Sequence, residues 1–301
     1  MAHSVSLQDY LNGLPPELSI PHDTEECLQM KYLKQLIASA AHRQLSKLDE
    51  LYQRHAGQEC YIFGDGISLK WMDLHQFADR LAILGNMSVY HKQVDVLRAP
   101  YCAVVEPYFF YPYFPYRGLG KLSLIRHYLQ QEYRKTIIQR PETLFFVNIS
   151  NYPVARFSNT LFVSRWYNPP FEGKNPFKDR EDSHHGTFKF QLSLAIYMGF
   201  KKAYLVGHDY THFPARSLHF HEKGEGIISV DDHRGYFREY INYAKQHIDL
   251  VTVTLDGCSE TLNYITYKDL TGKEPVFREN FDLVDRVKLE NLATWEGYSI
   301  F

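Results

Sequence analysis

The chain has 301 residues and a formal net charge of −2, with 45% hydrophobic and 23% charged residues. This length and balance indicate a folded protein with a sizeable core, and the small net charge gives no electrostatic support for nucleic-acid binding. The four cysteines lie far apart and form no Cys-x-x-Cys pair, so the sequence suggests neither a cysteine zinc site nor a disulfide framework.

The N-terminal residues lack the basic and apolar pattern of a secretory signal. No apolar stretch approaches the length that a membrane-spanning helix needs. We therefore expect a cytoplasmic protein, with contact at the inner face of the membrane left open.

The first half of the chain predicts helices and strands in alternation. Apolar residues recur at helical spacing from residue 24 to 57, and we expect a helical N-terminal extension over 1–57. Strands are then predicted at "ECYIFGDGISL", "LAILGNMSVY" and "APYCAVVEPYFF". A basic amphipathic helix over 121–139 and two strands, "TLFFVNIS" and "TLFVSRWY", follow.

The second half begins with residues 168–185, whose turn-rich and charged sequence is typical of a lid-like surface loop. A helix over 187–200, the strand "KAYLVGHDY", a loop to about 232, a helix over 236–247 and the strand "LVTVTLD" come next. This alternation predicts an α/β fold with a mostly parallel, Rossmann-like sheet and helices on both faces. We expect a catalytic domain over 58–262 and a C-terminal extension over 263–301.

Several predicted strands end in polar residues, as in "GDG", "GN", "EP", "GHDY" and "DGCS". In a parallel sheet these ends form one rim, where ligands bind. In "GDGISLK" (64–70) a strand meets a helix start through Gly-x-Gly, which is suited to a close backbone approach and to binding an anion. The stretch lacks the third glycine of the dinucleotide fingerprint and the Gly-Lys-Ser/Thr of a P-loop, so it indicates neither NAD binding nor ATP hydrolysis. A tight turn capped by Ser68 explains it equally well.

Two segments together resemble one family. "GDGISLK" is similar to a "GxGPSL" turn, and "AIYMGFKKAYLVGHDY" (195–210) is similar to a second motif, of the bacterial sialyltransferases of glycosyltransferase family 42 and the related motility accessory factor glycosyltransferases. The resemblance covers roughly residues 58–262. It implies a GT-A-variant fold and inverting transfer of sialic acid from CMP-sialic acid to a sugar hydroxyl, without a metal or other cofactor. The sequence agrees on the metal, since it contains no Asp-x-Asp.

The resemblance also implies site residues. The general-base histidine of the family falls on His233, its Gly-x-Asp falls on Gly207 and Asp209, and Tyr210 is a candidate phosphate ligand. The expected catalytic residues are therefore His233, Asp209 and Tyr210, although capping of a turn explains Asp209 equally well. Asp65 stands where the family has asparagine, and Ile67 where it has proline, which leaves the donor sugar open. With Ser259 added from the end of the last predicted strand, the expected donor-binding residues are Gly64, Asp65, Gly66, Ser68, Asn86, Glu106, Gly186, Thr187, Gly207 and Ser259.

Three other interpretations stay open, and one of them is a non-catalytic binding module. Pyrophosphokinases of the 6-hydroxymethylpterin type share the Gly-x-Gly-Pro-Ser-Leu turn and use ATP with Mg²⁺. A metal-dependent hydrolase could use "HFH" (219–221) with His212 and His184, because imidazole is a good zinc ligand. Histidines in contact with solvent or substrate explain that stretch more simply.

The expected partners are a CMP-activated donor, carrying sialic acid or a related nonulosonic acid, and a glycan acceptor. This combination is typical of lipopolysaccharide or capsule biosynthesis in bacteria. A lipid link on the acceptor and a homo-oligomer are left open, and no nucleic acid is expected.

Overall fold

The computed structural model describes residues 47–106, 109–110, 123–148, 151–163, 186–212, 215–229, 235–259, 261–293 and 299–301. Most of the expected N-terminal extension and the expected lid-like loop lie outside these residues. Within the part of the extension that is described, Leu48–Leu51 form a short 3-10 helix, η2. Among the described residues, no helix combines the length and the apolar character required to cross a bilayer.

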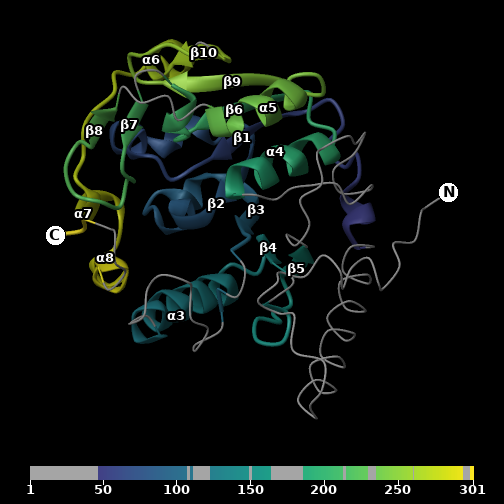
Figure 1. Ribbon diagram of the computed structural model, residues 1–301, viewed down its shortest axis with the longest axis vertical. Helices are drawn as coiled ribbons and strands as arrows, with labels where there is room; N and C mark the ends of the chain where they lie inside the picture. The colour runs from purple at the N-terminus through teal and green to yellow at the C-terminus, as the bar shows by residue number, and fades with distance from the viewer. Residues whose placement is uncertain are drawn as a thin grey trace, which may run out of the picture.

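An eight-stranded sheet forms the centre of the described chain, and every neighbouring pair in it is parallel. Figure 1 shows the strands in spatial order from β10 at the top to β5 at the bottom. In that order they are β10 (Asn263–Thr266), β9 (Asp249–Thr254), β6 (Lys202–Val206), β1 (Glu59–Phe63), β2 (Leu81–Gly85), β3 (Arg98–Val104), β4 (Leu144–Asn148) and β5 (Thr160–Val163). The predicted parallel α/β sheet is therefore confirmed.

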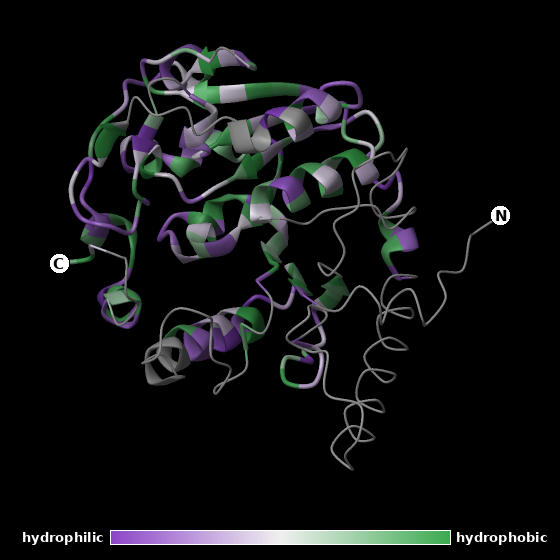
Figure 2. Cartoon of the chain, viewed as in Figure 1, coloured by the Kyte–Doolittle hydropathy of each residue, from purple (hydrophilic) through white to green (hydrophobic). Residues whose placement is uncertain are grey.

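Helices cover both faces of this sheet. Successive residues of a strand point to opposite faces, so Cys60 and Ile62 enter one core while Tyr61 and Phe63 enter the other. The first core is closed by α4 (Thr187–Tyr197), α5 (Gly235–Ala244) and η2. The second is closed by α3 (Ser123–Gln139), α6 (Tyr267–Thr271), α7 (Asn280–Leu283) and α8 (Arg286–Ala293). Figure 2 shows hydrophobic residues concentrated in the strands.

Short 3-10 helices follow the first two strands. They are η3 (Ile67–Trp71), η4 (Leu74–Phe77), η5 (Asn86–Tyr90) and η6 (Val94–Val96), and a further one, η8 (Asp209–Thr211), follows β6. A separate antiparallel hairpin of β7 (Ala215–Ser217) and β8 (Ile227–Ser229) lies in the stretch expected to be a loop up to residue 232. The second half of the expected strand "LAILGNMSVY" is η5, because the chain turns at Asn86 with a positive φ of 43°.

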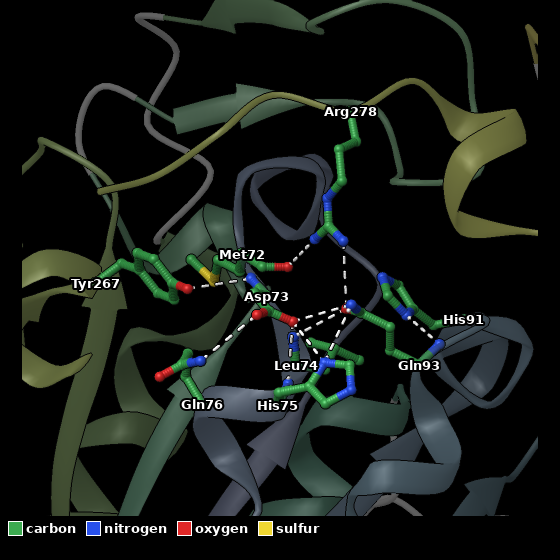
Figure 3. A network of polar contacts seen from close by, with 9 residues as sticks. All are labelled: Met72, Asp73, Leu74, His75, Gln76, His91, Gln93, Tyr267 and Arg278. Atoms are coloured by element: carbon green, nitrogen blue, oxygen red, sulfur yellow. Dashed lines mark hydrogen bonds and ion pairs between the residues drawn. The ribbon is translucent and has the colours of Figure 1, made fainter. Parts of the chain in front are cut away.

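The segment after residue 262 packs against the sheet and its connections. Its first element, β10, pairs with β9 as an edge strand. Arg278 then donates hydrogen bonds to the Met72 carbonyl and to Gln93 Oε1, the latter at 3.3 Å, and Tyr267 Oη accepts one from the Asp73 N–H at 3.2 Å (Figure 3). This segment therefore helps to fix the connection between β1 and β2.

Candidate functional site

The order of the strands places a topological switch point between β1 and β6. The chain runs from β1 outward through β2, β3, β4 and β5, and then returns to β6 on the other side of β1. Ligands of doubly wound sheets bind beyond the carboxyl ends of the strands at such a point. Here those ends carry the Gly64–Gly66 turn and residues 207–210, which are the two segments singled out in the sequence.

The Gly-x-Gly turn packs directly against the end of β6. The Gly64 N–H donates to the Val206 carbonyl and the Gly66 N–H donates to the Gly207 carbonyl, both at 2.8 Å. A Cβ atom at Gly66 would lie 2.6 Å from the Gly207 oxygen and 2.7 Å from the carboxyl carbon of Asp209. In the described structure the close approach predicted for these glycines is therefore an approach to the neighbouring loop of the protein.

Asp209 holds these two loops together. Its side chain is buried and accepts hydrogen bonds from the Ser68 N–H at 2.8 Å and from Ser68 Oγ at 2.5 Å. The carboxylate of Asp209 thus satisfies an N–H group in the first turn of η3, where a negative charge is favoured. The anion that the Gly-x-Gly turn was expected to bind at this N–H is supplied by the chain itself.

A second group of expected residues meets where β2 ends and α4 begins. Thr187 Oγ1 donates a hydrogen bond of 2.9 Å to Asn86 Oδ1. One turn further along α4, buried Gln191 donates to the carbonyls of Phe63 and Ile83, at 2.9 and 3.1 Å. Gly186 precedes the helix with a positive φ of 86°, and among the described residues, apart from Gly186 and its chain neighbours, no atom lies within 4 Å of where its Cβ would be. These contacts bring the expected residues Asn86, Gly186 and Thr187 to one place beside β1.

Three other expected residues, Tyr210, Ser259 and Glu106, make hydrogen bonds close to the ends of the strands. Tyr210 Oη lies 2.8 Å from Nδ1 of buried His208. Ser259 Oγ donates to the Thr211 carbonyl at 2.8 Å, which ties the end of β9 to η8. The Glu106 carbonyl, beyond the end of β3, accepts from Asn151 Nδ2 at 3.1 Å. The expected general base, His233, lies outside the described residues, as does His184.

A cavity of about 180 Å³ opens at the switch point. Four of the expected residues line it, Asp65, Gly66, Asp209 and Tyr210, and the rest of its wall comes from residues 215–219. Pockets for small molecules usually measure about 300–1,000 Å³, so this space is smaller than a typical pocket of that kind. Burial raises the pKa of Asp65, and the charge of His219 and nearby backbone N–H groups partly oppose that rise.

His219, which the sequence offered only as a possible zinc ligand, also lines this cavity. Its ring Nδ1 lies 2.7 Å from Oε1 of Glu222, whose carboxylate is buried. Burial alone would lower the pKa of His219, but the hydrogen bond to Glu222 and the charges of Asp65, Glu222 and Asp209 together raise it above its ordinary value. The corresponding pKa of Glu222 is lowered, since its hydrogen bonds with His219 and the Ser299 N–H outweigh the effect of burial.

The "HFHE" stretch also bears on the metal-site interpretation. His219, His221 and Glu222 have ligand atoms within 4.8 Å of one another. Glu222, however, already accepts hydrogen bonds from both the ring and the backbone N–H of His219 and from the Ser299 N–H. The charges of His219 and Lys70 also lower the pKa of His221, in addition to the larger effect of its burial. The cluster is therefore arranged as an imidazole–carboxylate pair with cations nearby.

No protein-family model and no curated protein matches the chain. Among solved structures, it is similar to the sialyltransferase CstII in complex with CMP, in a tyrosine-to-phenylalanine variant, with 14% identity, a TM-score of 0.43, and coverage of 79% of this chain and 98% of that one. The complex of CstII with a trisaccharide acceptor and CMP gives 13% identity, a TM-score of 0.41, and coverage of 79% and 99%. CstII from Campylobacter jejuni in complex with the substrate analogue cytidine-5′-monophosphate gives 14% identity, a TM-score of 0.42, and coverage of 79% and 98%.

Proposed function

We propose that the protein is a glycosyltransferase that moves sialic acid or a related nonulosonic acid from a CMP-activated donor to a hydroxyl of a glycan, with inversion. One observation carries the proposal. The two segments that resemble family 42 sialyltransferases, 64–70 and 195–210, are far apart in sequence, yet their ends meet at one cavity at the switch point. Nucleotide ligands bind at this place in doubly wound sheets.

The reaction requires a base for the acceptor hydroxyl, and His233 is the residue we assign to it. Histidine suits the task because its ordinary pKa lies near neutrality. The donor's ribose and base are assigned to Asn86, Gly186 and Thr187, which the hydrogen bond between Thr187 and Asn86 brings together. In this assignment Asp209 acts by holding η3 against the end of β6.

Asp65 takes the position at which the family has asparagine. A carboxylate there would repel the phosphate of the donor, but burial raises the pKa of Asp65 and so favours its neutral form relative to an exposed aspartate. A neutral carboxyl group both donates and accepts hydrogen bonds, as an asparagine side chain does. The exchange of asparagine for aspartate is therefore compatible with donor binding.

Calorimetric titration of the purified protein with CMP tests the proposal, with UDP, GDP and ADP as controls, first in EDTA and then with Mg²⁺. Selective binding of CMP in EDTA is the expected result. Preference for ADP with Mg²⁺ would favour pyrophosphoryl transfer instead.

The role of His233 is tested separately with a CMP-sialic acid donor and a set of glycan acceptors. His233→Ala is expected to reduce turnover about 100- to 10,000-fold while CMP binding persists, as for loss of a general base. His247→Ala, near the end of the helix that follows His233, is the matched control and should leave turnover unchanged. Equal turnover of wild type and His233→Ala would remove His233 from the mechanism.

A further inference from the structure

His219 and Glu222 form a hydrogen-bonded pair at the wall of the cavity. The proposed function gives neither residue a role. The His219 side chain is 39% exposed and that of Glu222 only 2%, so the carboxylate lies behind the ring, on the protein side. A buried carboxylate that hydrogen-bonds one ring nitrogen fixes the orientation and the tautomer of an imidazole. With Nδ1 hydrogen-bonded to Glu222, Nε2 is the ring nitrogen through which His219 would contact a ligand.

The backbone holds this pair against the Gly-x-Gly turn. His219 forms an isolated antiparallel bridge with Gly66, and the Phe220 N–H donates to the Asp65 carbonyl at 3.0 Å. Leu218, which directly precedes His219, has a φ of 82°, a left-handed conformation that is costly for a residue with a branched side chain. Such strain persists only where the surroundings enforce it, and here it places His219 at the cavity beside the end of β1.

The charges around the cavity favour a positive charge on His219. Glu222 on its own loop and Asp209 on η8 both favour its protonated form. The oxygens of Asp209 accept from Ser68. The other cation of the wall, Arg216, lies over the ring of Trp71, with 5.0 Å between its guanidinium carbon and the ring centroid.

We propose that His219 is the phosphate ligand of this cavity: its imidazolium, oriented by Glu222, donates a charge-assisted hydrogen bond to the phosphate of the donor. The inference rests on the proposed function and adds a residue to it. As the sugar transfers, the bond from the anomeric carbon to the phosphate oxygen breaks and its electron pair stays on that oxygen. The acceptor oxygen forms the new bond and its proton passes to His233, and nothing is oxidised or reduced. His219 stabilises the charge that develops on the phosphate, and Glu222 is a positioning residue.

Binding of CMP compared with binding of cytidine isolates the phosphate contact. We expect His219→Gln to weaken CMP binding about tenfold to a hundredfold, the loss expected for a hydrogen bond between charged groups, with cytidine binding unchanged. His219→Arg retains a cation and should preserve the preference for CMP from pH 5 to 8. The matched control is His75→Gln, which removes a similar pair with Asp73 (Nδ1 to Oδ1, 2.8 Å) in the network of Figure 3 and should change neither affinity.

The pH profile tests the positioning role of Glu222. In the wild type, affinity for CMP should fall as the pH rises through the pKa of His219. Glu222→Gln removes a charge that raises this pKa, so the fall in CMP affinity should move to lower pH. The Glu222→Gln variant also tests the inference if His219→Gln does not fold.

Wild-type protein that binds no CMP would overturn both the proposed function and this inference. Wild-type binding with an unchanged ratio of CMP to cytidine affinity in His219→Gln would overturn this inference alone, as would stoichiometric zinc that is lost in that variant.

Discussion

The contact between Ser68 and Asp209 makes a prediction about stability that is separate from catalysis. The two residues are 141 positions apart in the chain and both are buried. Replacing Asp209 with alanine removes both acceptors at once, and leaves the N–H and the hydroxyl of buried Ser68 without them.

The expected loss follows from the two hydrogen bonds. Bonds to a charged group contribute about 1.5–3 kcal/mol each, so Asp209→Ala should lower the free energy of unfolding by about 3–6 kcal/mol. Ser68→Ala removes only the hydroxyl bond and should cost about 1.5–3 kcal/mol. Asp209→Asn keeps an oxygen for the N–H and an amide that can donate to the hydroxyl, so its loss should be smaller than that of Asp209→Ala.

Urea unfolding of the single variants and of the double variant Ser68→Ala/Asp209→Ala measures these losses and their coupling. The exposed Asp256→Ala is the control and should stay within about 0.5 kcal/mol of wild type. If Asp209→Ala costs no more than this control, or if the two single losses simply add in the double variant, the contact does not hold the loops together. If Asp209→Ala does not fold, Asp209→Asn with Ser68→Ala provides the same test.

Two further predictions concern buried charges. Burial lowers the pKa of both His91 and His208 to about 3. Between about pH 3 and 6.5 the unfolded chain therefore binds protons that the folded chain does not, and the free energy of unfolding should rise with pH. His208→Gln or His91→Gln should each reduce the slope of that free energy against pH by about 1.4 kcal/mol per pH unit between pH 5 and 6, and an unchanged slope in urea unfolding would contradict the argument. Lys70 is fully buried, and its Nζ lies 3.1 Å from Oε2 of Glu279, whose side chain is 30% exposed. Glu279→Gln should therefore destabilise the protein by about 1–3 kcal/mol and Lys70→Met/Glu279→Leu by less. Thermal unfolding in which the double variant is the weaker of the two would refute this.

The sequence was sufficient for seven of the eight strands of the central sheet, all except β10, because these strands carry a local signal. The runs that became β1 and β6 are continuous in apolar residues and end in glycine, as expected for strands that are buried on both faces. The same signal placed the Gly-x-Gly turn and residues 207–210 at one rim. It could not show that Asp209 caps η3, because nothing near Asp209 in the sequence indicates a partner 141 residues away.

The rest of the fold and site lacked such a signal. The helices after residue 266 are short, from four to eight residues, and too brief to show a clear helical period. His219 stands in a stretch with glycines nearby that reads as a loop, and its position at the cavity depends on a bridge to Gly66. A histidine followed three residues later by a glutamate was the available hint, since the pair needs only a tight turn to meet.

The central position of β1 also has a consequence for how the chain folds. β1 is the first strand of the sheet to be made, and one of its two neighbours, β6, follows only after β2, β3, β4 and β5. An intermediate that contains only β1–β5 would therefore present β1 as a bare edge, with four of its five residues apolar in character and ready to pair with another chain. Aggregation during refolding should thus depend on how quickly β6 docks, and an added peptide with the sequence of β6 would compete for that edge.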